Sequence, residues 1–255
     1  MTIKTTLVGA LIYAAMLLCL GAFGLWSARR QRAGHGLFAL AFVATLAAFF
    51  AQWRSAGHVP MQSLFDVFLC LGVAIYPLSL FWRRVLGAEG MGADALIGLV
   101  VLAPAGFVFK AEPQPLPPAL LSELFIPHVA AYLMAYVVMI KAALLAVRPP
   151  KGDDDCAAYR LVRFAFPLLT TGLLLGAWWG KLAWGNYWNW DPKELWALAT
   201  WLVYLGYLHL RSAHGTRYAR LNAAMVVAGA VCIVLTLLWV NLATKIFPGM
   251  HSYAF

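Results

Sequence analysis

The sequence predicts an all-α polytopic membrane protein with about eight transmembrane helices. Two observations carry this prediction. Hydrophobic residues make up 63% of the 255 residues and charged residues only 11%, with a mean hydropathy of +0.78. Apolar runs of about 20 residues, the length that crosses a hydrocarbon core, also recur along the whole chain. We expect one transmembrane domain over residues 1–255 and no separate soluble domain.

The first apolar run, residues 7–26, is predicted to be a retained helix and not a cleaved signal peptide. Its positive charges follow it at Arg29, Arg30 and Arg32, and only Lys4 precedes it, whereas a signal peptide has the reverse order. The apolar runs together predict the spans 6–26, 35–53, 64–82, 93–109, 128–147, 162–180, 194–211 and 222–243.

Basic residues are divided unequally between the two sets of loops. The first, third, fifth and seventh loops carry twelve Lys and Arg residues, and the opposite side carries six. Because cytoplasmic loops are enriched in basic residues, the excess places the odd-numbered loops in the cytoplasm and both termini outside. The predicted location is the bacterial inner (cytoplasmic) membrane or its equivalent.

Charge and cysteine usage exclude two other classes of function. The net charge of +9 comes from short loops between apolar runs, and no basic stripe alternates with exposed aromatic residues, so nucleic-acid binding is not indicated. The four cysteines are far apart and form no CxxC pair, so neither a disulfide framework nor a zinc site is expected.

The stretch WGNYWNWDPKELWALATW, residues 184–201, holds five tryptophans. Part of it has a structural explanation, because Asp191 suits a helix N-cap, Pro192 the first helical position and Glu194 the third position of a capping box. A few tryptophans at a span end also serve as interfacial anchors. Anchoring therefore remains an alternative to any binding role.

The density of tryptophan favours a second interpretation. Seven tryptophans fall within residues 178–201, more than an aromatic belt needs, and they would make a flat apolar platform with N–H donors. Such a platform suits a large planar ligand with acidic edges, such as haem. In the predicted topology, His128 and His251 lie on the same outer face, and two histidines are what a six-coordinate haem iron requires.

His209 is different, because it lies 18 residues beyond Asp191 and helical rise places it roughly 27 Å deeper. It cannot reach the outer site. The residues around it favour a solvated side chain beside Arg211.

The stretch WGNYWNWDPKE resembles the WWD signature of haem-handling proteins of cytochrome c biogenesis. GHVPMQSLFDVF resembles a family stretch that usually reads GHFPLSNLYESL, with Asp66 where the family has Glu, and HSYA resembles the terminal motif. The best match is the CcsA/ResC family, and the resemblance runs from residue 55 to the end.

The resemblance implies a ligand set and partners. His128 and His251 would be the axial ligands of a haem b (iron protoporphyrin IX), and His209 the membrane-embedded histidine of the family, against the solvated interpretation. A CcsB-type membrane subunit would supply the opposing membrane histidine. The implied haem-contacting residues of the WWD segment are Trp184, Gly185, Tyr187, Trp188, Trp190, Asp191, Lys193 and Glu194.

The function that the resemblance implies is that of a cytochrome c synthase subunit, which holds haem at the outer face for attachment to CxxCH apocytochrome c. No nucleophile, general base or hydrolytic metal motif occurs, so no catalytic residue is assigned and catalysis would consist of positioning. Two alternatives remain open. One is a haem transporter or chaperone of CcmC type, and the other is a HemX-like regulatory membrane protein.

Overall fold

A computed structural model describes residues 4–147 and 154–242, and every regular element in those residues is helical. The all-α prediction is confirmed. The elements are α1 Leu7–Ser27, α2 Gln31–Ala56, α3 Leu64–Val85, α4 Met91–Phe107, η1 Pro118–Leu120, α5 Phe125–Ala146, α6 Asp154–Trp184, α7 Pro192–His214, α8 Ala219–Val234, the π-helical turn η2 Leu235–Trp239 and α9 Val240–Leu242.

Six helical segments of the described residues are long and apolar enough to cross a membrane, and the protein is an integral membrane protein. They comprise α1, α2, α3, α5, most of α6, and α8 with η2. The predicted span 93–109 falls on α4, which is apolar but only 17 residues long. The predicted span 194–211 falls on α7, which is not among these six segments. Its Trp and Tyr side chains are less hydrophobic than aliphatic ones.

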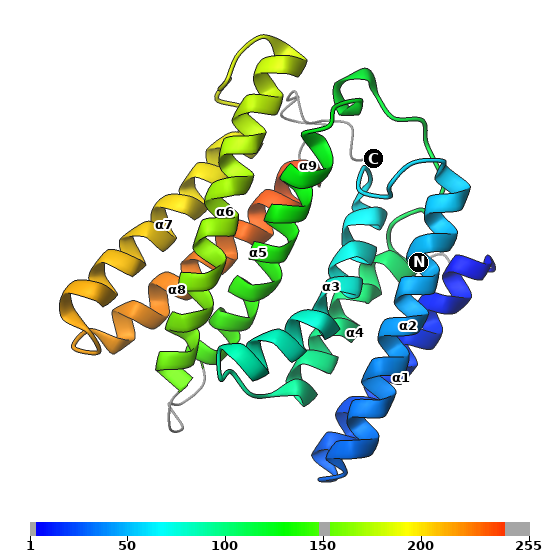
Figure 1. Cartoon of the computed structure of the whole chain (residues 1–255), viewed down its shortest axis with the longest axis horizontal. Helices are drawn as coiled ribbons and strands as arrows, with labels where there is room; N and C mark the ends of the chain where they lie inside the picture. Colours follow the sequence, from blue (N-terminus) through cyan, green and yellow to red (C-terminus); the bar gives the residue numbers. More distant parts are fainter. Residues whose placement is uncertain (1–3, 148–153, 243–255) are drawn as a thin grey trace. The chain divides into compact units, whose positions relative to one another are not determined.

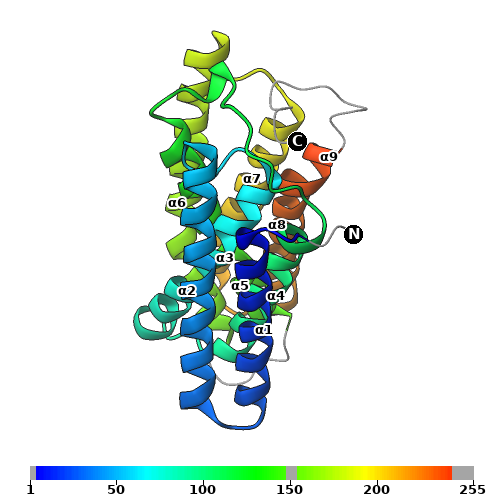
Figure 2. The same ribbon diagram turned by 90° about the vertical axis from the view of Figure 1, so that its right-hand side faces the viewer.

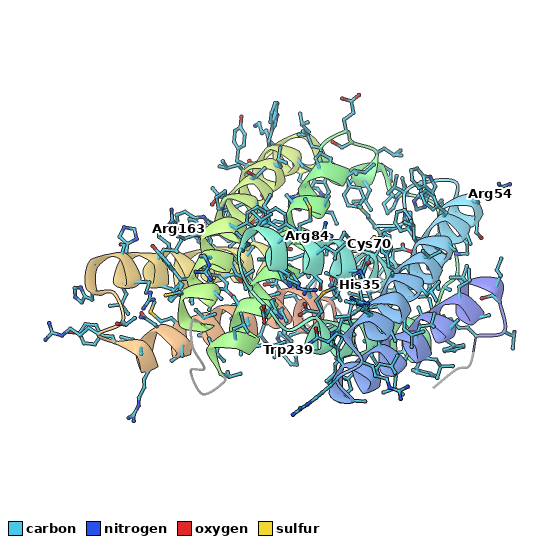
Figure 3. All side chains as sticks on the ribbon, turned by 60° about the horizontal axis from the view of Figure 1, so that its bottom comes forward. His35, Arg54, Cys70, Arg84, Arg163 and Trp239 are labelled. Atoms are coloured by element: carbon cyan, nitrogen blue, oxygen red, sulfur yellow. The ribbon has the colours of Figure 1, made fainter. Side chains whose placement is uncertain are left out.

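The helix α6 is longer than the predicted span 162–180. It has 31 residues, which corresponds to about 46 Å of helical rise and exceeds a hydrocarbon core of about 30 Å. Arg160 and Arg163, both counted among the basic residues of the preceding loop, therefore lie within the first turns of this helix; Figure 3 labels Arg163. The first turns of α6 therefore carry charged residues, and the apolar part of the helix follows them.

The chain forms two compact units, an N-terminal unit up to Leu116 and a C-terminal unit from Pro117. In the N-terminal unit, α1 and α2 form an antiparallel pair, and α4 packs on both α1 and α3 (Figure 1). Its buried polar groups bond to one another, since Ser79 Oγ and Trp82 Nε1 each donate to Asp94 Oδ2 at 3.0 Å. The single domain over residues 1–255 stays a prediction.

In the C-terminal unit, α5 packs closely along α6, α7 and α8 run antiparallel, and α8 also contacts α5 (Figures 1 and 2). This order brings the start of α5, the end of α6, the start of α7 and α9 to one end of the unit. The tryptophan-rich segment joins α6 to α7 at that end. The fold thus places His128, the fourth residue of α5, at the same end of the unit as this segment.

Candidate functional site

Residues 185–191, called here the Trp-rich loop, connect two well-defined helix ends. The helix α6 ends at Trp184, and Gly185 follows with φ +84°, a left-handed conformation that glycine adopts readily at a helix end. The helix α7 begins after Asp191, whose side chain and that of Glu194 form a capping box. The cap predicted from Asp-Pro-Lys-Glu is confirmed.

Glu194 does more than complete the cap. Its Oε2 atom accepts the backbone N–H of Asp191 at 3.3 Å and that of Asn189 at 2.8 Å. Trp190 lies between these two residues and has φ +58°, which is rare for a bulky side chain and costs about 1–3 kcal/mol. A single carboxylate therefore holds the loop in a strained shape, which no sequence signal predicted.

The loop presents aromatic surface. The side chains of Trp190 and Tyr187 are 66% and 61% exposed. Trp188 packs against Trp190 edge to face, with ring centroids 6.1 Å apart. The Lys181 ammonium lies 5.7 Å from the Tyr187 ring centroid and donates to the Gly185 carbonyl. These contacts define the shape of the loop although the rings of Tyr187 and Trp190 are exposed.

Two N–H groups of the loop are buried without an acceptor. Trp188 Nε1 and Asn189 Nδ2 have no hydrogen-bond partner among the residues that the structure describes. A buried donor left unbonded costs about 1–3 kcal/mol. The loop therefore has donors suited to a carboxylate or carbonyl that a ligand or another segment would supply.

His128, near the start of α5, has a defined orientation. Its Nδ1 atom is 2.8 Å from the carbonyl oxygen of Gly172 on α6. Because a carbonyl oxygen can only accept, this contact places a proton on Nδ1, and the neutral ring then carries its lone pair on Nε2. That is the nitrogen with which this imidazole would bind a metal.

Trp179 connects His128 to the predicted WWD residues. Its side chain is buried, and its Nε1 donates to the Ala119 carbonyl at 2.8 Å. The centroid of its ring lies 5.6 Å from that of His128 and 4.9 Å from that of Trp184. Trp179 was missing from the predicted contact residues, although it belongs to the same tryptophan cluster in the sequence.

Lys193 ties the start of α7 to the last described helix. Its Nζ donates to Asn241 Oδ1 at 2.9 Å, and Asn241 Nδ2 donates to the Leu237 carbonyl at 2.6 Å. Lys193 precedes the predicted span 194–211, and desolvation lowers its pKa to about 8, against a raising effect of Asp191. His251 lies outside the described residues, ten positions after Asn241 in the sequence.

The structure does not bring His209 to this site. It lies near the far end of α7, its side chain is exposed, and its Nδ1 is 3.0 Å from the Leu205 carbonyl of the same helix. Of the predicted residues, His128 and the WWD segment are thus joined through Trp179, and His209 is separate. The joined group offers an imidazole nitrogen and aromatic faces, and the loop that follows Trp184 has two N–H donors without a partner among the described residues.

The chain is similar to several known proteins. The profile of the cytochrome C assembly protein family matches residues 11–247. Proteins named cytochrome c biogenesis protein CcsA are 34% identical in Chlamydomonas reinhardtii, over 80% of this chain and 63% of that protein, and 32% identical in Guillardia theta, over 86% and 85%. The protein of that name from Parasynechococcus marenigrum (strain WH8102) is 31% identical over 97% of this chain and 96% of its own.

Among solved structures, cytochrome c heme lyase CcmF has a similar fold, with a TM-score of 0.61 and 21% sequence identity. The similarity covers 96% of this chain and 49% of the CcmF chain. The chain thus spans about half of CcmF and just under two thirds of the Chlamydomonas protein.

Proposed function

The chain belongs to the cytochrome C assembly protein family, and from this membership we propose that it holds haem b as cargo against the Trp-rich loop. In this proposal it is a subunit of a cytochrome c synthase, and the haem is presented at the outer face of the membrane to the CxxCH motif of apocytochrome c. The observation that carries the proposal is the oriented imidazole of His128 beside Trp179, whose ring in turn packs against that of Trp184.

The residues present fit such a ligand in three respects. His128 offers Nε2 as the metal-binding nitrogen, since its Nδ1 is bonded to the Gly172 carbonyl. The exposed rings of Tyr187 and Trp190 offer flat apolar surface of the kind that covers a porphyrin. Trp188 Nε1 and Asn189 Nδ2 are buried donors that lack an acceptor among the described residues, and a haem propionate would supply one.

We assign the remaining predicted residues as follows. His251, which lies outside the described residues, would be the second ligand of the haem iron, as the family resemblance implies. Lys193 supplies positive charge for a propionate. Asp191 and Glu194 shape the loop, because both already accept backbone N–H groups.

Haem, when bound, supplies the vinyl groups that add the two cysteine thiols of apocytochrome c to form thioethers. The contribution of this chain is then to fix the ring and keep water from it, an effect of orientation. His209, exposed on α7, is proposed to meet a histidine of a CcsB-type membrane subunit. The proposed topology has both termini outside, which reporter fusions at residues 155 and 215 on the cytoplasmic side would support.

The decisive experiment co-expresses the protein with a CcsB-type subunit and an apocytochrome c and scores covalent haem. The synthase subunit predicts covalent haem in the cytochrome and a low-spin bis-histidine spectrum in the purified protein. Replacing both His128 and His251 by Gly should remove that spectrum. Bound haem without covalent attachment would indicate a transporter or chaperone, and a protein without haem would indicate a regulatory role.

A further inference from the structure

Two glycines of α6, Gly172 and Gly176, lie where side chains of α5 press against the helix. A Cβ atom built at Gly176 would lie 2.5 Å from His128 Cε1 and 2.8 Å from His128 Nδ1. A Cβ atom at Gly172 would lie 2.9 Å from Cδ2 of Tyr132. Real Cβ atoms do not approach other atoms so closely, so any side chain at these positions would displace the ring that it meets.

The imidazole of His128 has little room to move away from such a side chain. Its Nδ1 is bonded to the Gly172 carbonyl at 2.8 Å. The Tyr132 ring stands perpendicular to it, at 5.1 Å between centroids, and the Trp179 ring lies at 5.6 Å. Tyr132 is itself seated on Gly172. The ring is therefore held by a hydrogen bond and by two aromatic neighbours.

We propose that Gly176 and Gly172 are positioning residues, which seat the His128 imidazole so that Nε2 is the nitrogen offered to the haem iron. The inference rests on the proposed function in taking His128 as a ligand. Gly176 leaves the space that the ring occupies, and Gly172 leaves space for Tyr132 while its carbonyl fixes the proton on Nδ1. A hydrogen bond from the second ring nitrogen also raises the basicity of a metal-bound histidine.

The test compares Gly176→Ala with Gly180→Ala, one turn further along the same helix. At Gly180 the nearest atoms to an added Cβ are the Asn186 carbonyl oxygen at 3.4 Å and Trp184 Cε3 at 3.6 Å, which are ordinary contacts. Both changes raise the helix propensity of α6 by the same amount, about 1 kcal/mol. Any difference between them therefore reports the contact with His128.

We expect Gly176→Ala to push the His128 imidazole away from the Gly172 carbonyl and so to weaken haem binding about 10-fold or more, the effect of losing an outer partner of a metal ligand. The remaining haem should show a high-spin component, whereas Gly180→Ala should keep the low-spin spectrum of the parent protein. Haem per protein and the spin state are measured on the full-length protein in detergent. If Gly176→Ala matches the parent in both, or if Gly180→Ala shows the same loss, the positioning role is wrong.

A double-mutant cycle with His128→Gly separates positioning from folding. In the His128→Gly background the imidazole is gone, so Gly176→Ala should cause no further loss of haem. If Gly176→Ala prevents accumulation in the membrane, the double variant should restore it, and failure to do so would overturn the inference. A parent protein that binds no haem would overturn the proposed function as well, so the two failures are distinguishable.

Discussion

The helices α3 and α7 both begin with a capping box, and the two boxes differ in what they hold. At α3, Ser63 Oγ accepts the N–H of Asp66 at 3.2 Å, and Asp66 Oδ2 accepts the N–H of Ser63 at 3.1 Å. At α7, Glu194 accepts the N–H of Asp191 in the same way, but its Oε2 also accepts the N–H of Asn189. The second box therefore shapes the preceding loop as well as the helix start.

The two loops that lead into these helices differ accordingly. Before α3, the only positive φ is at Gly57, where glycine carries no steric cost. Before α7, Trp190 has φ +58° and an exposed ring, and its neighbours Trp188 and Asn189 each bury a donor without an acceptor among the described residues. The loop before α3 also buries an acceptor, Gln62 Oε1, without a donor among the described residues, so the loop before α7 differs from it chiefly in its strained tryptophan, a feature that folds tolerate at ligand sites.

The largest effects are expected from replacing tryptophans, and a tryptophan of α3 should affect stability where those of the Trp-rich loop affect haem binding. Trp82 is 1% exposed and donates to Asp94, so Trp82→Ala should lower the free energy of unfolding by roughly 3–5 kcal/mol and deplete the protein. Trp188→Ala and Trp190→Ala should reduce haem per protein and cytochrome c maturation while the protein still accumulates. Immunoblots and haem assays measure both quantities. Loop variants that keep full haem, or that vanish from the membrane, would identify these tryptophans as interfacial anchors.

The next largest effects are expected from replacing the acidic residue of each capping box, Glu194 at α7 and Asp66 at α3. Glu194→Ala leaves two loop N–H groups without their acceptor and releases Trp190 from its strained conformation, so haem per protein should fall severalfold. Asp66→Ala should destabilise the protein by about 1–2 kcal/mol, seen as a lower Tm, with haem per folded protein unchanged. Equal losses of haem in the two variants would show that both boxes serve stability alone.

A smaller effect is expected on haem retention, which should depend on pH through Lys193 at the start of α7. The α3 cap has no lysine, whereas Lys193 at α7 has a pKa of about 8, lowered by desolvation. Its ammonium is charged below that pH and neutral above it, so its attraction for a haem propionate should weaken between about pH 7 and 9. Haem retention measured across that range should decline in the parent protein and stay level in Lys193→Met. A parallel decline in both would assign the pH dependence elsewhere.

The cap of α7 can be predicted from the sequence, whereas the shape of the loop before it cannot. The pattern Asp-Pro-Lys-Glu predicts the cap of α7, because capping depends on side chains a few residues apart. The second hydrogen bond of Glu194 and the left-handed Trp190 depend on the geometry of the loop. The hydrogen bond between His128 and the Gly172 carbonyl depends on contacts between α5 and α6. Such contacts join residues 44 positions apart, which no local pattern reports.

The smallest expected effect is that of Asp191→Asn, which separates the cap from its charge. Asp191 Oδ1 accepts the N–H of Lys193 at 2.8 Å, and an asparagine oxygen can accept the same bond, so the protein level should stay near that of the parent. Asp191→Ala loses the bond and should cost about 1 kcal/mol. The negative charge of Asp191 raises the pKa of Lys193, so its removal in Asp191→Asn should move the pH at which haem retention declines below about 8. An unchanged midpoint, with haem retained, would mean that Lys193 does not act on the propionates, and the α7 cap would then differ from the α3 cap in shape alone.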